Sequence, residues 1–270
     1  MSMKTVSQLL TLLLVALFGV QSYGQGLEVS PVRLDFSLEP GSSEARTITV
    51  RNTSNKRASY TLSSADWYLD EDGSVIQVPA GEIERSCAEW ISFTPALIEL
   101  EPNASQEVTV TMRVPSSEQS TKWAITYVAI KREQEAPAAD RDLAMGINVD
   151  QTVGVFVTQS PRSNRNASAQ LLDFEDVSEA GADMRTFAVR AKNTGDKIID
   201  CNMYLVVSDL QNATERKLEP ISFRVLPDGV IRQELSMPND LKKGSYLVAA
   251  ILDYGPNYPL EGVQMQLNVE

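Results

Sequence analysis

Apolar and polar residues alternate along most of this chain. An alternation with a period of two over four to eight residues predicts half-buried β-strands, because successive side chains of a strand point to opposite faces of a sheet. No long segment shows the 3.6-residue period of an amphipathic helix. The clearest alternating series are Ile48 and Val50; Val108, Val110, Met112 and Val114; Phe187, Val189 and Ala191; Met203, Leu205 and Val207; Tyr246, Val248, Ala250 and Leu252; and Val263, Met265, Leu267 and Val269.

Turn-forming residues separate these predicted strands, for example Glu39-Pro40-Gly41, Glu71-Asp72-Gly73 and Pro227-Asp228-Gly229. Many short strands at this spacing predict an all-β fold of the sandwich or barrel type.

The polar stretch QSPRSNRNAS, residues 159–168, has no periodicity and reads as a linker. We therefore expect one domain over residues 25–160, a linker over 161–168 and a second domain over 169–270. A weak internal repeat supports two copies of one sandwich type. Residues 47–62 are similar to 186–207, and residues 100–115 are similar to 225–238. Chance similarity between strand sequences is the alternative.

Residues 1–24 have the three parts of a secretory signal peptide. Lys4 supplies a positive start, residues 9–20 form a 12-residue apolar run, and Ser22 and Gly24 offer a small-x-small cleavage site. The run is too short for a membrane-spanning helix, which needs about 20 apolar residues. We expect a mature protein from Gln25 to Glu270, exported to the periplasm and not inserted in the membrane. An uncleaved anchor or a buried helix is the alternative.

The composition of the chain disfavours a catalytic function and favours a binding or structural one. The chain of 270 residues has no histidine and only two cysteines, and its formal net charge is −12. A Ser-His-Asp triad and an imidazole metal site are therefore excluded, and the acidic balance disfavours nucleic-acid binding. We expect no cofactor and no enzymatic activity. Cys87 and Cys201 are either joined by a disulfide or buried separately as thiols.

Six segments, in this order, resemble the PapD-like periplasmic chaperones that assemble pili. No single segment is diagnostic, but their succession covers about half of the chain. The segments are SPVRLDF (30–36), ITVRNTSNKRASYTL (48–62), SADWYLDEDG (64–73), WISFTPALIELEPNASQEVTVTMRVP (90–115), KWAITYVAIKREQ (122–134) and INVDQTVGVFVTQSP (147–161). The resemblance implies two immunoglobulin-like domains set at an angle, like a boomerang.

The resemblance also implies a mechanism. Such chaperones bind an incomplete β-sandwich subunit by lending it a strand, so that main-chain hydrogen bonds give affinity and alternate side chains fill the open groove of the subunit. If Phe156 matches the phenylalanine of the family's last strand, the lent strand is 143–149. Met145, Ile147 and Val149 then occupy its alternating apolar positions. The alternative is that these three side chains face the core of their own domain.

A basic pair in the cleft between the domains holds the partner's C-terminal carboxylate in this family. Arg33 matches the first member, and a planar guanidinium suits a carboxylate. The second member is a lysine in the family, and Gly154 stands at that position here. This departure puts usher-dependent assembly in doubt. Lys131 and Arg162 are conceivable substitutes, and an ordinary surface role for Arg33 is the alternative.

The remaining candidates favour structural interpretations. We expect Trp67, Trp90 and Trp123 to pack in a core or an interface rather than form a ligand cage. The acidic run of residues 70–72 favours a solvated hairpin over a calcium site, because no full ligand loop accompanies it.

The sequence thus leaves three classes of function. The first is a periplasmic chaperone-like binder of secreted or surface-assembled β-subunits. The second is a fixed structural or adaptor component of an envelope secretion or assembly complex. The third and least favoured is an enzyme that uses two carboxylates, such as a glycan hydrolase. Edge strands of low charge also allow a resting homodimer.

Overall fold

The computed structural model describes residues 26–131 and 151–269, and almost all of their regular structure is β-strand. One short 3-10 helix, η1 (Ala88–Trp90), interrupts the strands of this part of the chain. No helix within it is long and apolar enough to cross a membrane. The expected signal peptide and the expected partner-binding strand with Met145, Ile147 and Val149 lie outside the described residues.

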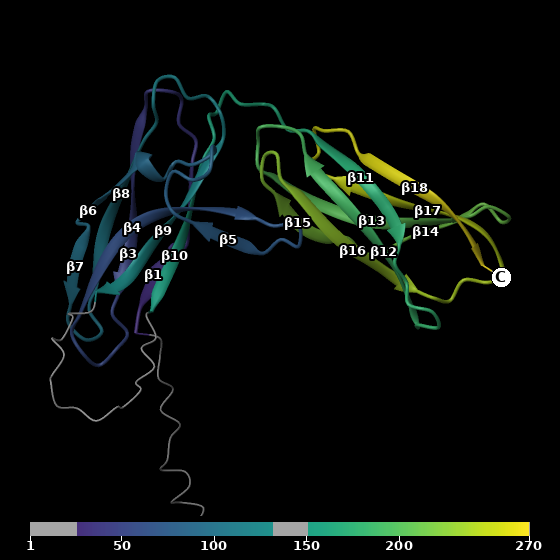
Figure 1. Ribbon diagram of the computed structural model, residues 1–270, viewed down its shortest axis with the longest axis horizontal. Coiled ribbons are helices and arrows are strands. Elements are labelled where there is room, and N and C mark those ends of the chain that lie inside the picture. The colour runs from purple at the N-terminus through teal and green to yellow at the C-terminus, as the bar shows by residue number, and fades with distance from the viewer. Residues whose placement is uncertain (1–25, 132–150, 270) are drawn as a thin grey trace, which may run out of the picture.

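The first domain consists of two facing sheets (Figure 1). The strand order of the first sheet is β1 (Glu28–Ser30), β3 (Ser43–Arg51), β8 (Ser105–Arg113) and β6 (Ile91–Thr94). The second has the order β2 (Arg33–Phe36), β10 (Thr152–Gln159), β9 (Lys122–Lys131), β4 (Ala58–Leu69) and β5 (Val75–Val78), and β7 (Leu97–Leu100) also pairs with β4. The chain changes sheets between β1 and β2.

The second domain repeats this arrangement. Its first sheet has the order β11 (Ala169–Asp176), β12 (Met184–Asn193) and β16 (Val230–Pro238). Its second sheet has the order β14 (Thr214–Lys217), β13 (Ile199–Asp209), β17 (Gly244–Asp253) and β18 (Glu261–Val269), and β15 (Ile221–Val225) also pairs with β13. The predicted all-β fold of two immunoglobulin-like sandwiches is therefore confirmed.

Each domain has a core of its own, built from the alternating positions. Ile48, Val50, Val108 and Val110 are fully buried between the sheets of the first domain. Phe187, Val189, Met203 and Leu205 occupy the corresponding space in the second. Burial of these faces removes apolar surface from water and is the main stabilising contribution of each sandwich.

The internal repeat has a structural basis in two buried asparagines. Asn52 follows β3, and its Nδ2 donates to the carbonyls of Lys56, at 2.7 Å, and Leu100, at 3.1 Å. Asn193 ends β12, and its Nδ2 donates to the carbonyls of Lys197 and Val225 at the same two distances. Each side chain thus ties the turn after one strand to the end of another strand.

The backbone around the two asparagines repeats as well. The N–H of Asn52 donates to Ala104 O at 2.9 Å, and that of Asn193 donates to Gly229 O at 3.0 Å. The residues before these two acceptors, Asn103 and Asp228, both have a positive φ, of 61° and 64°. The similarity of 47–62 to 186–207 and of 100–115 to 225–238 therefore marks equivalent corners of two sandwiches.

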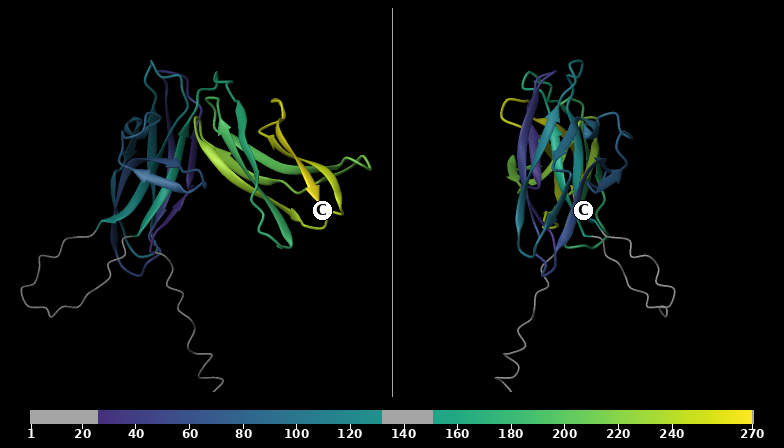
Figure 2. Two further views of the ribbon diagram at one scale, coloured as in Figure 1. Left: turned by 45° about the vertical axis from the view of Figure 1, so that its right-hand side comes forward. Right: turned by 90° about the vertical axis from the view of Figure 1, so that its left-hand side faces the viewer.

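The two domains lie at an angle to each other, joined by the segment between β10 and β11 (Figures 1 and 2). The β4–β5 hairpin projects from the first domain toward the second. At its tip, the carbonyl of Glu71 accepts a hydrogen bond from Arg232 N at 2.6 Å. The Glu71 carboxylate lies 3.7 Å from the Arg190 guanidinium. The hairpin is thus a bridge between the domains.

An apolar cluster fills the junction behind this hairpin. Trp67 and Trp123 of the first domain, each 4% exposed, pack with Leu226 of the second, which is 3% exposed. The Trp123 indole donates to the carbonyl of Trp67 at 2.7 Å. Trp90 packs against the core of the first domain. The expectation that the three tryptophans serve packing is confirmed.

An ionic contact also joins the two domains. The Arg85 guanidinium of the first domain lies 2.5 Å from Asp196 Oδ1 and 2.7 Å from Asp228 Oδ2 of the second. Asp196 also accepts from the backbone N–H of Thr121 at 3.0 Å and from Asn164 of the linker at 2.8 Å. The apolar cluster and these contacts together fix the angle between the domains.

Candidate functional site

The N-terminal half of β10 has an open edge. On one side, β10 pairs with β9 along its whole length, from Thr152 to Gln159. On the other side it pairs with β2, in parallel, only from Phe156 to Gln159. Residues 152–155 have no partner strand on that side among the residues that the structure describes.

Two hydrogen bonds determine which backbone groups face this open side. The N–H of Phe156 donates to Val32 O, away from β9, at 3.0 Å. The carbonyl of Gln151 accepts from Ile130 N of β9 at 3.2 Å. Because the direction of the backbone groups alternates along a strand, Thr152 and Gly154 direct their N–H and C=O groups outward. An incoming strand would find these groups ready to pair.

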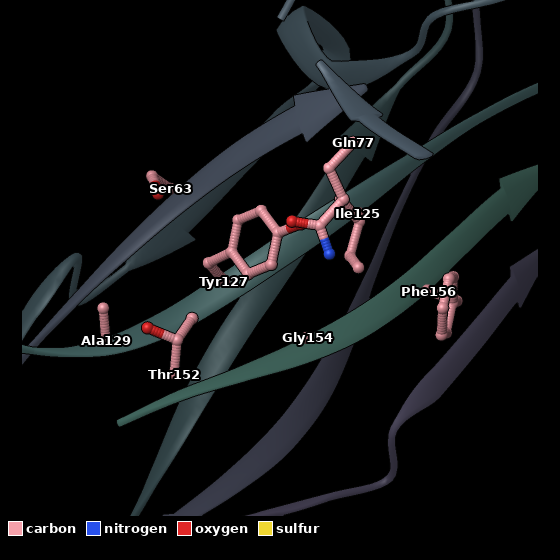
Figure 3. A pocket seen from close by; sticks show the side chains of 8 residues that line it. All are labelled: Ser63, Gln77, Ile125, Tyr127, Ala129, Thr152, Gly154 and Phe156. Carbon is pink, nitrogen blue, oxygen red and sulfur yellow. The ribbon is translucent and has the colours of Figure 1, made fainter. Parts of the chain in front are cut away.

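A hollow of about 620 Å³ lies on the outer face of the sheet beside this edge (Figure 3). Three rows of paired residues cross it: Gly154 lies opposite Tyr127, Phe156 opposite Ile125, and Thr152 opposite Ala129. Ser63 of β4 and Gln77 of β5 complete its wall. Through Phe156, whose ring centroid lies 4.9 Å from that of Trp67, the hollow adjoins the cluster between the domains.

Gly154 gives the hollow its shape. In Figure 3 the strand is bare between Thr152 and Phe156, and the side chains of Ile125 and Tyr127 stand beside the gap. A Cβ at position 154 would lie 2.7 Å from Ile125 Cδ1 and 3.5 Å from Tyr127 Cε1. The space that a larger residue would use is therefore lined by an apolar and an aromatic side chain.

The Tyr127 hydroxyl is buried and has no hydrogen-bond partner in the described part of the chain. Burial raises the pKa of this phenol, because the charged form loses hydration. The group is therefore a neutral donor and acceptor at physiological pH.

The structure places Arg33 close to this edge. Arg33 begins β2 and lies opposite Phe156, so its side chain projects from the same face as Gly154, two residues earlier in β10. Its side chain is 42% exposed and lies 3.8 Å from Asp35. Arg33 and Gly154, which the sequence resemblance matched to a basic pair, thus lie on neighbouring strands and on the same face of the sheet.

Neither suggested substitute for the missing lysine lines the hollow. Lys131 is the exposed last residue of β9, on the same face as Ala129 and Tyr127 but beyond the hollow. Arg162 is an exposed residue of the linker, beside the Glu39 carboxylate.

The acidic run of residues 70–72 and the two cysteines, the other candidates from the sequence, have structural roles. Asp70 accepts backbone hydrogen bonds from Asp72, at 3.1 Å, and Ser74, at 2.8 Å, and thereby closes the β4–β5 turn. The described residues contain no group of three or more acidic, cysteine or histidine side chains arranged to hold a metal ion. Cys87 and Cys201 are free thiols, each buried in the core of a different domain.

Sequence reasoning missed the hollow and the Arg85 contact. Tyr127, Gln77 and Ser63 come from three strands, and only the register of the sheet brings them together. Arg85 and Asp196 are separated by 111 positions. The one available signal was Gly154, an isolated glycine in a strand pattern, which often marks a close approach of another group.

Comparison with known proteins agrees with a β-sandwich. A family model described as an Fn3-like domain matches residues 39–143. No curated protein matches the sequence.

Several solved structures match most of the chain. The class 5 fimbriae chaperone CfaA is 12% identical, with a TM-score of 0.44, over 90% of this chain and 99% of its own. A chain in a chaperone–tip adhesin complex of CFA/I fimbriae biogenesis is 12% identical, with a TM-score of 0.48, over 89% of this chain and 97% of its own. A chain from the Salmonella enterica SafA pilin–SafB chaperone complex is 14% identical, with a TM-score of 0.43, over 88% and 96%.

Each of these structures is described as a fimbrial chaperone or as a complex that contains one.

Proposed function

We propose that this protein is a non-catalytic, chaperone-like binder of β-rich subunits that are secreted or assembled at the cell surface. It captures a subunit by pairing with the edge of β10. The observation that carries the proposal is the open edge at Thr152–Val155, where two residues direct backbone groups outward that have no partner among the described residues. An exposed strand edge is a template for another strand, and β-augmentation uses it for recognition.

The pairing continues into the segment that precedes β10. Met145, Ile147 and Val149 fill the groove of the client, as the sequence resemblance implies. Arg33 receives the client's terminal carboxylate, because its partly exposed guanidinium lies beside the open edge. Residues 1–24 direct the protein across the inner membrane to the periplasm and are then cleaved, and its pilus-type clients are found there.

The experiment is a comparison of two variants at position 147. Ile147→Asp places a charge among the apolar side chains that enter the client, so it abolishes capture. Ile147→Val keeps the apolar character and retains capture. The client is identified by co-purification from the envelope of the producing cell, and its mass is measured together with that of the complex. Circular dichroism verifies that both variants are folded.

The outcome separates the classes of function. A 1:1 complex with a small β-rich subunit, lost in Ile147→Asp, is the expected result. A large complex of fixed composition that survives Ile147→Asp would identify an adaptor instead. A complex of two copies of this chain would assign the edge to self-association.

A further inference from the structure

The hollow beside β10 carries no charge. Its wall consists of Ser63, Gln77, Ile125, Tyr127, Ala129, Thr152, Gly154 and Phe156. This lining is notable in a chain with 24 basic and 36 acidic residues. A charged group among these side chains would lose hydration without a counter-charge in the lining itself, because Arg33 lies outside the lining, beyond Phe156. The ligand that fits is therefore uncharged.

The polar side chains of the hollow lack partners. The Tyr127 hydroxyl is buried and unpaired within the described residues. Ser63, Gln77 and Thr152 are exposed and make no side-chain hydrogen bond to other described residues, so they are open to a ligand, but only the Tyr127 hydroxyl is a buried group without a partner. A buried polar group without a hydrogen-bond partner raises the free energy of the protein. A ligand that supplies the partner removes this penalty and therefore binds more tightly. The ligand therefore brings a hydrogen-bonding group as well as an apolar body.

The position of the hollow indicates how the ligand arrives. A strand that pairs with the open edge places one residue opposite Gly154, with its side chain on the face of the hollow. Neighbouring side chains of paired strands lie about 5 Å apart, but Gly154 has none. An aromatic side chain that covers a glycine on a neighbouring strand is a known stabilising device in sheets. The rings of Tyr127 and Phe156 flank that place and offer edge or offset contacts.

We propose that the hollow is a specificity pocket for an uncharged aromatic side chain with a hydrogen-bonding group, namely tyrosine, at the client residue opposite Gly154. The inference rests on the proposed strand pairing at β10 and adds to it which residue the client presents. Ile125, Tyr127 and Phe156 contact the ring, and the Tyr127 hydroxyl with Gln77 receives the phenol.

The test uses end-capped hexapeptides of alternating threonine and valine with one variable central residue. The purified protein is titrated with the tyrosine, phenylalanine, alanine and glutamate versions, followed by NMR. We expect the tyrosine peptide to bind about five- to tenfold more tightly than the alanine peptide, with phenylalanine between them and glutamate no better than alanine. Equal affinity for the tyrosine and alanine peptides would overturn the proposal that the hollow is a specificity pocket. Absence of binding by every peptide would overturn strand pairing itself.

Two variants and one control test whether the hollow is where the tyrosine side chain of the peptide binds. Tyr127→Phe removes the hydroxyl and lowers the affinity for the tyrosine peptide to that for the phenylalanine peptide. Tyr68→Phe is the matched control, because Tyr68 is an exposed tyrosine of the same sheet that does not line the hollow. Gly154→Lys fills the hollow, requires the Ile125 side chain to shift away from the new Cβ, and removes the preference for tyrosine. An unchanged preference in Gly154→Lys would place the aromatic site elsewhere.

Discussion

Removal of the Arg85 side chain should loosen the angle between the two domains. Arg85 joins the first domain to Asp196 and Asp228 of the second, through contacts of 2.5 and 2.7 Å. In Arg85→Ala the apolar cluster of Trp67, Trp123 and Leu226 remains as the main junction. We expect the docked arrangement to lose stability while each sandwich stays folded.

The exposure of the side chains in this contact determines how much docking free energy is lost in Arg85→Ala. The side chains of Arg85 and Asp196 are each 21% exposed, and a hydrogen bond to a charged group at such a site contributes about 1.5–3 kcal/mol. Asp228 is 71% exposed, so its contact contributes on the order of 0–1 kcal/mol. Asp196 keeps its donors from Thr121 and Asn164, which limits the cost of leaving its charge behind. We expect a loss of about 2–3 kcal/mol, or about 30- to 150-fold in the docking equilibrium.

The assay is a distance distribution between spin labels on cysteines placed at Thr47 and Gln266, one in each domain. Both positions are exposed, and the native cysteines are buried and stay unlabelled. The distribution should broaden in Arg85→Ala. The control is Arg224→Ala, which removes a two-bond contact to Asp200 inside the second domain. An unchanged distribution in Arg85→Ala, or equal broadening in the control, would refute the reasoning.

Three further predictions concern stability and ionisation. Asn52→Ala and Asn193→Ala should each destabilise their own domain by about 2–4 kcal/mol, measured by denaturant unfolding, because each leaves buried carbonyls unpaired. Burial raises the pKa of Cys201 to about 12, so the thiol should stay protonated and unreactive toward Ellman's reagent at pH 8 until the protein unfolds. Hydrogen bonds from Ser163 lower the pKa of Glu39, so this carboxylate favours the folded state above its unfolded pKa and loses that contribution on acidification. Ser163→Ala should raise the Glu39 pKa in an NMR titration.

The fold could be predicted because each strand of a sandwich has one buried face. Val108, Val110 and Met112 alternate with polar residues in the sequence because they lie on the buried face of their strand, and all three are fully buried. The repeat of Asn52 and Asn193 was visible for a similar reason, since a buried turn needs the same amide at the same place.

The site was less predictable because it depends on register and on pairs that are distant in sequence. Alternation places Tyr127 on the outer face of β9, but only the sheet shows that Gly154 lies beside it. The ion pair of Arg85 with Asp196 has no local pattern at all. The resemblance matched Arg33 and Gly154 to the positions of a basic pair, and the register places Arg33 opposite Phe156, two residues from Gly154.

A proline at position 152 tests the open edge of β10 most directly. The N–H of Thr152 points away from β9, so Thr152→Pro removes a donor from the free edge without breaking the pairing to β9. Thr152→Ala is the control, because it keeps the N–H. The measurement is the affinity of each variant for the co-purified β-rich subunit. We expect Thr152→Pro to lose about tenfold or more and Thr152→Ala to stay near the wild-type value, with equal melting temperatures. Wild-type affinity in Thr152→Pro would contradict strand pairing at this edge.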